Sequence, residues 1–154
     1  MPDGPDAGAL LALLVARAEA SPDREICGLI LRAPDGALSL EPVANAAPAA
    51  RAEFALAPEA LLAVLRRLDR AGGAIHAVYH SHLLGGAELS GGDLAGAILG
   101  GAPVLPGVEQ WVVALEAGRV AGVRAHRWID GRFVGRDLWP PGDPILQSGA
   151  RPVY

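Results

Sequence analysis

Two histidines, a serine and an aspartate lie close together in the stretch AVYHSHLLGGAELSGGD, and their types and spacing suit a metal site. His80 and His82 end an apolar run typical of a β-strand, and residues i and i+2 of a strand project from one face roughly 6–7 Å apart. Both imidazoles can therefore reach one ion. Ser90-x-x-Asp93 reads as a helix start and places Asp93 in the first turn as a third ligand. Such a set leaves the fourth tetrahedral position for water, the layout of a catalytic zinc site.

The rest of the sequence supplies elements that position these residues. The pattern predicts a mixed α/β (α+β) fold in one domain, with a mixed central sheet flanked by helices. The expected elements are a helix carrying Leu10, Leu11, Leu13 and Leu14, strands at Glu25–Arg32 and 37–45, a helix from Pro58 with the stripe Leu61, Leu62, Leu65 and Leu68, a strand from Ala74, a short helix over Asp93–Leu99, and an antiparallel meander of 110–116, 120–129 and 133–136.

Composition narrows the class of protein. The chain has 154 residues, 51% of them hydrophobic, which suits one domain with one core. The net charge of −4, with no basic run, argues against nucleic acid or an anionic membrane as partner. Asp3 and Asp6 stand where a signal peptide needs basic residues, and the single cysteine asks for no oxidising compartment. We therefore expect a cytoplasmic globular protein.

Three other candidate residues have plainer interpretations. His76 shares the strand parity of His80 and His82, so it is either a supporting or alternative ligand or a histidine hydrogen-bonded within the sheet. His126 is expected to be a surface or packing residue of the meander. Cys27 lies in an apolar strand, where a lone cysteine behaves as a small buried hydrophobe rather than a nucleophile.

The spacing His-Ser-His, seven residues, Ser, two residues, Asp resembles the motif of the JAMM (MPN+, JAB-type) zinc metalloproteases, here in a bacterial stand-alone form. The matching upstream glutamate is Glu25 in EICGLIL, and Asn45 and Phe54 also match common family residues. The resemblance covers about residues 25–136. The family commonly has proline where this chain has Leu83 and Leu89, and this difference predicts a more mobile rim around the substrate groove.

The resemblance implies the MPN fold, which is cytidine-deaminase-like in outline, and a role for each motif residue. His80, His82 and Asp93 would bind one Zn²⁺, Glu25 would act as general acid and base, and Ser90 would donate to the oxyanion. The implied activity is that of an isopeptidase or peptidase that hydrolyses the bond after the C-terminal Gly-Gly of a ubiquitin-like or sulfur-carrier protein. The implied partner is the tail of such a carrier.

Two alternatives and one boundary complete the expectations. Many proteins of this fold have lost the metal ligands and serve as assembly modules, so a non-catalytic scaffold remains an alternative. A zinc nucleobase deaminase needs Pro-Cys-x-x-Cys, which this chain lacks. We expect the catalytic domain to span residues 1–138 and a proline-rich tail to span 139–154. The sequence does not predict the oligomeric state.

Overall fold

The computed structural model describes residues 6–140 and contains three helices and eight strands within that range. The elements in chain order are α1 (Asp6–Glu19), β1 (Cys27–Arg32), β2 (Leu38–Val43), α2 (Pro58–Ala71), β3 (Ala74–His82), α3 (Gly91–Ala97), β4 (Ile98–Leu99), β5 (Ala102–Pro103), β6 (Glu109–Glu116), β7 (Arg119–Ile129) and β8 (Arg132–Trp139).

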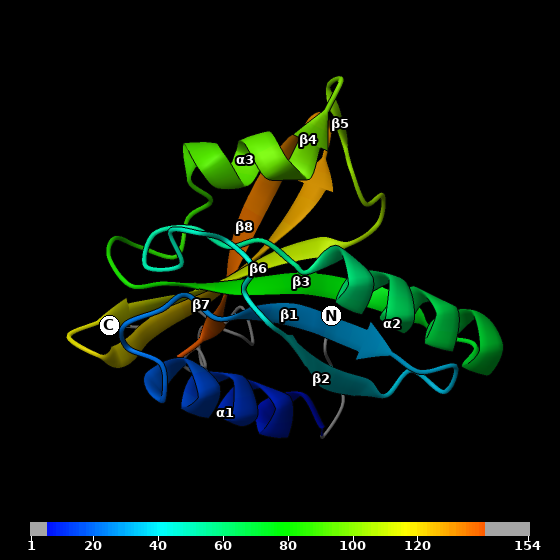
Figure 1. Ribbon diagram of the computed structural model, residues 1–154, viewed down its shortest axis with the longest axis horizontal. Helices are drawn as coiled ribbons and strands as arrows, with labels where there is room; N and C mark the ends of the chain where they lie inside the picture. Colours follow the sequence, from blue (N-terminus) through cyan, green and yellow to red (C-terminus); the bar gives the residue numbers. More distant parts are fainter. Residues whose placement is uncertain (1–5, 141–154) are drawn as a thin grey trace, which may run out of the picture.

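Six strands form one mixed sheet in the order β2-β1-β3-β6-β7-β8. Every neighbouring pair is antiparallel except β3 and β6, which are parallel. A parallel pair needs a crossover, and here α3 and the small β4–β5 hairpin provide it. Figure 1 shows α1 and α2 on opposite sides of the sheet and α3 away from both of these helices. The predicted α+β fold with a mixed, helix-flanked sheet is confirmed.

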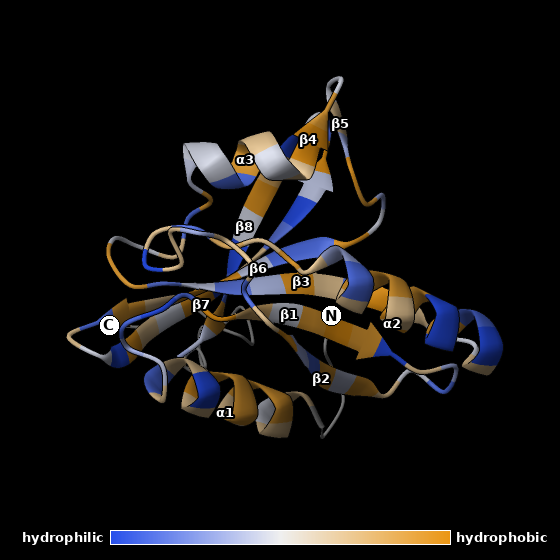
Figure 2. Cartoon of the chain, in the orientation of Figure 1, coloured by the Kyte–Doolittle hydropathy of each residue, from blue (hydrophilic) through white to orange (hydrophobic). Residues whose placement is uncertain are grey.

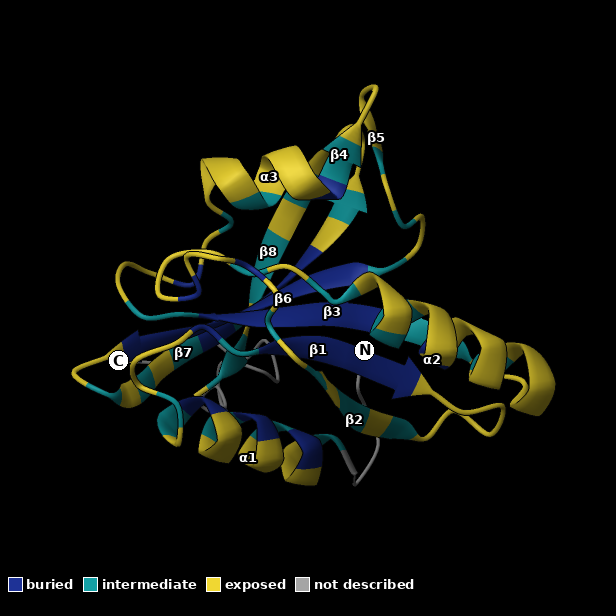
Figure 3. Ribbon diagram, viewed as in Figure 1, coloured by how far each residue is buried: buried dark blue, intermediate teal, exposed yellow. Residues whose placement is uncertain are grey.

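The two faces of the sheet carry separate apolar clusters. Leu10 and Leu14 of α1 pack with Tyr79 and Trp111 on one face. Val64 of α2 packs with residues that include Leu29 and Val78 on the other face. Figure 2 shows apolar residues concentrated in β1 and on α1, and Figure 3 shows burial running along β1, β3 and β6 while α3 is largely exposed. His80 and His82 thus project from a largely buried central strand.

Two of the four leucines predicted to form the buried stripe of α2 do not pack against the sheet. Leu61 and Leu68 pack against the sheet, but Leu62 and Leu65 are exposed, and the buried residue between them is Val64. The spacing 61, 64, 68 is an equally good helical face, but four leucines within about two turns drew the prediction away from Val64. On α1, likewise, Leu10 and Leu14 are buried while Leu13 is exposed.

A β-bulge in β3 changes the direction of His76. Ile30 pairs with Ala77 and Leu31 pairs with Ile75, so His76 has no partner on β1. The extra residue shifts the alternation, because a bulge re-aims the side chains on one side of it. His76 therefore points to the α1 face, where its ring meets that of Trp111 at 6.0 Å. His76 thus lies away from His80 and His82, and of its two interpretations the histidine hydrogen-bonded within the sheet is the one that fits, since its Nδ1 lies 3.4 Å from Arg32 Nη1.

The bulge places His76 in a buried charge network around Glu109, whose side chain is 4% exposed. Arg136 binds both carboxylate oxygens, Arg127 Nε donates at 3.3 Å and Trp111 Nε1 donates at 3.2 Å. His76 Nε2 lies 3.4 Å from the same carboxylate. Burial raises the pKa of Glu109, but these partners outweigh it and hold the pKa well below its usual range. The network joins β3, β6, β7 and β8.

No helix in the range 6–140 is long and apolar enough to span a membrane. Trp139 is the last residue of β8. The remainder of the expected tail, 141–154, and the first residues of the expected domain, 1–5, lie outside the described residues.

Replacing Glu109 by alanine should lower the free energy of unfolding by about 3 kcal/mol, because it leaves the half-buried Arg136 guanidinium and the indole N–H of buried Trp111 without the buried carboxylate that they bind. Glu88→Ala is the matched control, since Glu88 pairs with Arg124 but its side chain is 71% exposed, and such pairs contribute less than about 1 kcal/mol. Denaturant unfolding of both variants measures the difference. Equal losses would show that the buried network is not a stabilising feature.

Candidate metal centre

Three side chains meet at the end of β3. His80 Nε2 lies 3.0 Å from His82 Nε2 and 3.1 Å from Asp93 Oδ2, and His82 Nε2 lies 3.0 Å from the same Asp93 oxygen. All three residues are buried or half-buried. One ligand atom from each residue therefore faces a common point, which makes this cluster compatible with a metal site.

The start of α3 fixes the carboxylate. Ser90 is the N-cap: its Oγ accepts from Asp93 N at 3.1 Å, and its own backbone N donates to Asp93 Oδ2 at 2.8 Å. The capping box predicted from Ser90-x-x-Asp93 is confirmed. Because the Ser90 hydroxyl accepts at the cap, its proton remains available to donate to another group.

The donor set of the cluster favours a cation at its centre. His82 Nδ1 lies 2.9 Å from the carbonyl oxygen of Gly86, which only accepts, so Nδ1 carries a proton. In neutral His82 the Nε2 lone pair then faces Asp93 Oδ2, and two acceptors 3.0 Å apart repel unless a proton or a metal ion lies between them. A carbonyl that orients a histidine in this way is typical of metal-binding histidines.

The pKa shifts of the three residues agree with this arrangement. Burial lowers the pKa of His80, so its neutral, ligating form is favoured. Burial also acts to lower the pKa of His82, but hydrogen bonds to Asp93 and Gly86 outweigh it and the net shift is upward. Burial raises the pKa of Asp93, yet hydrogen bonds from both histidines leave it far below its usual range. Asp93 is thus ionised near neutral pH, and its negative charge favours a cation at the point where the three residues meet.

His80 is held from behind by an aromatic ring. The ring of Phe54 stacks on the imidazole with centroids 4.1 Å apart and an interplanar angle of 14°. His80 is fully buried, and its Nδ1 has no hydrogen-bond partner among residues 6–140. The Phe54 ring therefore holds one face of this imidazole, while its Nε2 lies 3.1 Å from Asp93 Oδ2.

Glu25 reaches the cluster from the other side of the β1–β3 pair. The strand that follows Glu25 begins at Cys27, two residues later than predicted, because Ile26 N donates to the Ser81 side chain (Oγ, 2.8 Å) and not to a backbone carbonyl of β3. Ser81 N still donates to Ile26 O, at 3.0 Å. Cys27 pairs with His80, so the same antiparallel register sets Glu25 opposite His82. Only 6% of Glu25 is exposed. Burial raises its pKa to about 7, with His82 lowering it and the charges of Asp93 and Glu53 raising it further.

Asn45 holds the loop that carries Glu25. Its Nδ2 donates to the carbonyl oxygens of Glu25 and Glu53, each at 2.9 Å, and its Oδ1 accepts from Ala47 N and Ala55 N. One side chain thus joins the segment before β1 to the segment before α2. These four hydrogen bonds explain why an asparagine suits position 45.

Two residues of β7 support the loop between His82 and Ser90, which the sequence did not predict. His126 is buried, and its Nε2 lies 2.9 Å from Ala87 O, to which it donates. Arg124 Nε pairs with Glu88 at 2.8 Å. Both contacts hold the loop between His82 and Ser90. Nothing local in the sequence signals them, since His126 and Ala87 are 39 residues apart.

Other expectations near the site have clear outcomes. Cys27 is buried, and burial together with the nearby Glu25 raises its pKa to about 11, so a thiolate nucleophile is disfavoured. Leu83 packs against the α1-side cluster, and Leu89 packs with Ala87 and Val112. The greater mobility of the groove rim, expected because Leu83 and Leu89 stand where the family has prolines, stays a prediction.

In metal-free protein, Glu25→Gln should raise the free energy of unfolding at pH 8 but change it little at pH 5. The Glu25 pKa rises from 4.5 to about 7 on folding, so the folded protein binds this proton more tightly, and wild-type stability declines as pH rises between those values. Glutamine does not titrate, so the difference between the proteins grows over the same range. Denaturant unfolding in the presence of chelator tests this, and a pH-independent difference would contradict it.

Comparisons with known proteins agree with the geometry. Residues 8–128 match the family described as prokaryotic homologs of the JAB domain. A solution structure of a Desulfitobacterium hafniense protein superposes with a TM-score of 0.65 at 18% identity, covering 83% of this chain and 86% of that one. A solution structure of a Salinibacter ruber protein gives 0.56 at 24% identity, covering 92% and 91%. None of the curated proteins compared with the chain matches it.

The structural likenesses support the fold, and the family match spans most of the chain, including every residue of the His-Ser-His and Ser-x-x-Asp motifs. The JAB-type resemblance is thereby confirmed. The chain belongs to the prokaryotic homologs of the JAB domain.

Proposed function

We propose that the protein is a zinc-dependent peptidase or isopeptidase. The observation that supports this most strongly is the convergence of His80 Nε2, His82 Nε2 and Asp93 Oδ2 within 3.0–3.1 Å of one another. The JAB domain family includes metalloproteases, and this chain retains the complete ligand set of the motif.

The three ligand atoms fit zinc in number, type and spacing. Zinc binds imidazole nitrogen and carboxylate oxygen at about 2.0–2.2 Å, and tetrahedral angles then separate the ligand atoms by roughly 3.3–3.5 Å. The observed separations need only a few tenths of an ångström of expansion. Three protein ligands leave one position open, as in catalytic rather than structural zinc sites. When bound, zinc polarises the substrate carbonyl and lowers the pKa of water at the site towards about 7.

Glu25 and Ser90 would carry out the proton transfer and the charge stabilisation. Glu25 takes a proton from the attacking water and returns it to the departing amine, and its burial, which raises its pKa in the metal-free protein, makes it a stronger base than an exposed carboxylate. The Ser90 hydroxyl, which uses a lone pair at the helix cap, donates its proton to the oxyanion of the tetrahedral intermediate. Asn45 and Ser81 position the backbone that carries Glu25.

We further propose that the substrate is the C-terminal Gly-Gly tail of a ubiquitin-like or sulfur-carrier protein, joined to an extension or to another molecule. The motif resemblance supports this substrate class. So does the compactness of the 154-residue chain, which leaves little room for the large insertions that would recognise a folded ubiquitin.

Zinc binding should depend on the cluster and not on histidine content. After zinc loading and desalting, the wild type should retain about one zinc per chain, and His82→Ala and Asp93→Ala should retain little, because two ligands hold zinc far more weakly than three. His76→Ala is the matched control, since His76 lies on the opposite face with Trp111. Metal analysis by mass spectrometry measures all four. Equal retention by wild type and both ligand variants would contradict the assignment.

Catalysis should separate from metal binding in the two remaining motif residues. Glu25→Gln should keep its zinc but lose almost all hydrolysis of a Gly-Gly-extended carrier protein. Ser90→Ala should lower kcat by about 10²–10³, the usual loss for one oxyanion donor. Product formation with and without chelator is the readout. Undiminished cleavage in the presence of chelator, or cleavage by zinc-loaded Glu25→Gln at the wild-type rate, would contradict the proposed mechanism.

The alternative is a non-catalytic scaffold of the same fold. It predicts a protein that stays metal-free in zinc-replete buffer, so the metal analysis above also separates these two functions.

A further inference from the structure

A pocket of about 540 Å³ opens beside the metal cluster. Ser90 and Asp93 form part of its wall, so it is continuous with the proposed reaction centre. Its other walls come from segment 52–56, from α2 and the sheet, and from residues 104–105. Pockets of about 300–1,000 Å³ hold ligands of the size of small drugs. A pair of glycines has no side chains and would leave most of this space unfilled.

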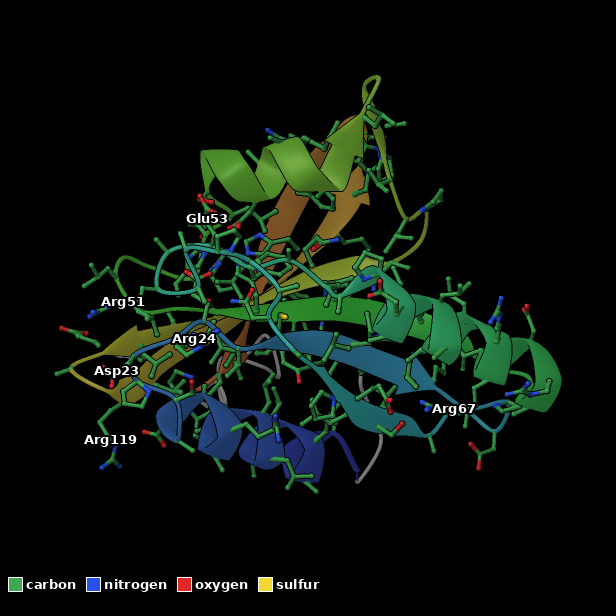
Figure 4. The ribbon with its side chains drawn as sticks, viewed as in Figure 1. Asp23, Arg24, Arg51, Glu53, Arg67 and Arg119 are labelled. Atoms are coloured by element: carbon green, nitrogen blue, oxygen red, sulfur yellow. The ribbon has the colours of Figure 1, made fainter. Side chains whose placement is uncertain are left out.

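The lining of the pocket is apolar and its charges are acidic. Leu56, Leu61 and Val78 lie on one side, and Val104 and Leu105 complete the apolar surface. The only charged residues among those that line it are Glu53 and Asp93. Figure 4 shows Glu53 between the segment that precedes α2 and helix α3. This combination suits an apolar side chain and disfavours an anionic one.

Helix α3 contributes a wall with almost no side chains. Besides Asp93, its lining residues are Gly92, Gly96 and Ala97. A Cβ atom added at Gly96 would meet nothing within 4 Å, and one added at Gly92 would meet only Ser90 Oγ, at 3.8 Å. The space in front of Gly96 is therefore free for part of a bound molecule.

We propose that this pocket holds a bulky apolar side chain of a substrate residue close to the scissile bond, and that the missing side chain at Gly96 provides the room. The inference rests on the proposed peptidase function, and it adds a specificity determinant to it. The residue concerned is either the one before the Gly-Gly pair or the one after the scissile bond. Hydrophobic pockets discriminate by about 10–200-fold for each methylene, so leucine should be preferred to alanine by at least tenfold.

Gly96→Leu adds an apolar side chain to the pocket wall at a position where the new Cβ atom meets nothing within 4 Å. Leucine is a better helix former than glycine, and the open space at Gly96 accepts a side chain, so the variant should fold and bind zinc as the wild type does. Ala95→Leu is the matched control: it adds a leucine to the same helix at an exposed position that does not line the pocket. Zinc content and Tm verify both variants before the assay.

Two series of Gly-Gly peptides serve as substrates, with alanine, leucine or phenylalanine at either of the two positions named above. At one of these positions, wild type and Ala95→Leu should cleave the leucine or phenylalanine peptide at least tenfold more efficiently, in kcat/KM, than the alanine peptide. Gly96→Leu should cleave the three peptides of that series at rates within about threefold of one another. Zinc-dependent cleavage without preference in either series, or a preference that survives unchanged in Gly96→Leu, would overturn the proposal.

A binding measurement separates failure of this proposal from failure of the proposed function. The same peptides are titrated calorimetrically into metal-free His82→Ala protein, alone and combined with Gly96→Leu or Ala95→Leu. If zinc-loaded wild type cleaves no peptide, the peptidase function fails, but tighter binding of the leucine or phenylalanine peptides that only Gly96→Leu abolishes still supports the pocket. Equal binding of all peptides would overturn the pocket assignment.

Discussion

The register between β1 and β3 is the constraint on which the rest of the site depends. Cys27 lies opposite His80, and the reciprocal hydrogen bonds between Ile26 and Ser81 extend this pairing past the end of the strand. Glu25 consequently faces the histidines from a segment 55 residues away in sequence from the one that carries them. A slip of one residue would turn Glu25 to the other face of the sheet, because side chains alternate along a strand. Ser81 between the two histidines is thus as important for geometry as the histidines are for binding.

The two faces of the central sheet carry different features: a buried charge network on one, and the candidate metal cluster on the other. On the α1 face, Glu109 ties four strands together through a buried charge network. On the other face, the ends of the strands are left to the metal cluster, to loops and to a pocket. The bulge at His76 makes this division possible, since it sends one histidine of β3 to the network while two others meet Asp93. A rigid sheet between the two sites lets loops around the cluster vary without loss of the fold.

Much of this arrangement was predictable from the sequence. The strands around the site are apolar and carry few glycines, and the capping box marks the start of α3, so local rules place His80 and His82 at the end of a strand and Asp93 in the first turn of a helix, as the structure has them. The position of Glu25 came from the motif resemblance, because no local rule relates it to histidines far along the chain.

The parts that were not predictable depend on geometry beyond the local pattern. Strand parity assigned His76 to the wrong face because a bulge leaves no mark in a run of apolar residues. The phase of α2 was wrong because Leu62 and Leu65 are as apolar as the residues that pack. The β4–β5 hairpin has two residues in each strand, too few for an alternating pattern. The role of His126 and the pocket beside Gly96 arise from contacts, or from missing side chains, between distant segments.

X-ray absorption spectroscopy at the zinc edge of the loaded wild-type protein tests the central claim most directly. The account predicts four nitrogen or oxygen neighbours at about 2.0–2.2 Å, with the outer-shell scattering of two imidazoles. A sulfur neighbour at about 2.3 Å, which would indicate Cys27, or a first shell without imidazole, would contradict it.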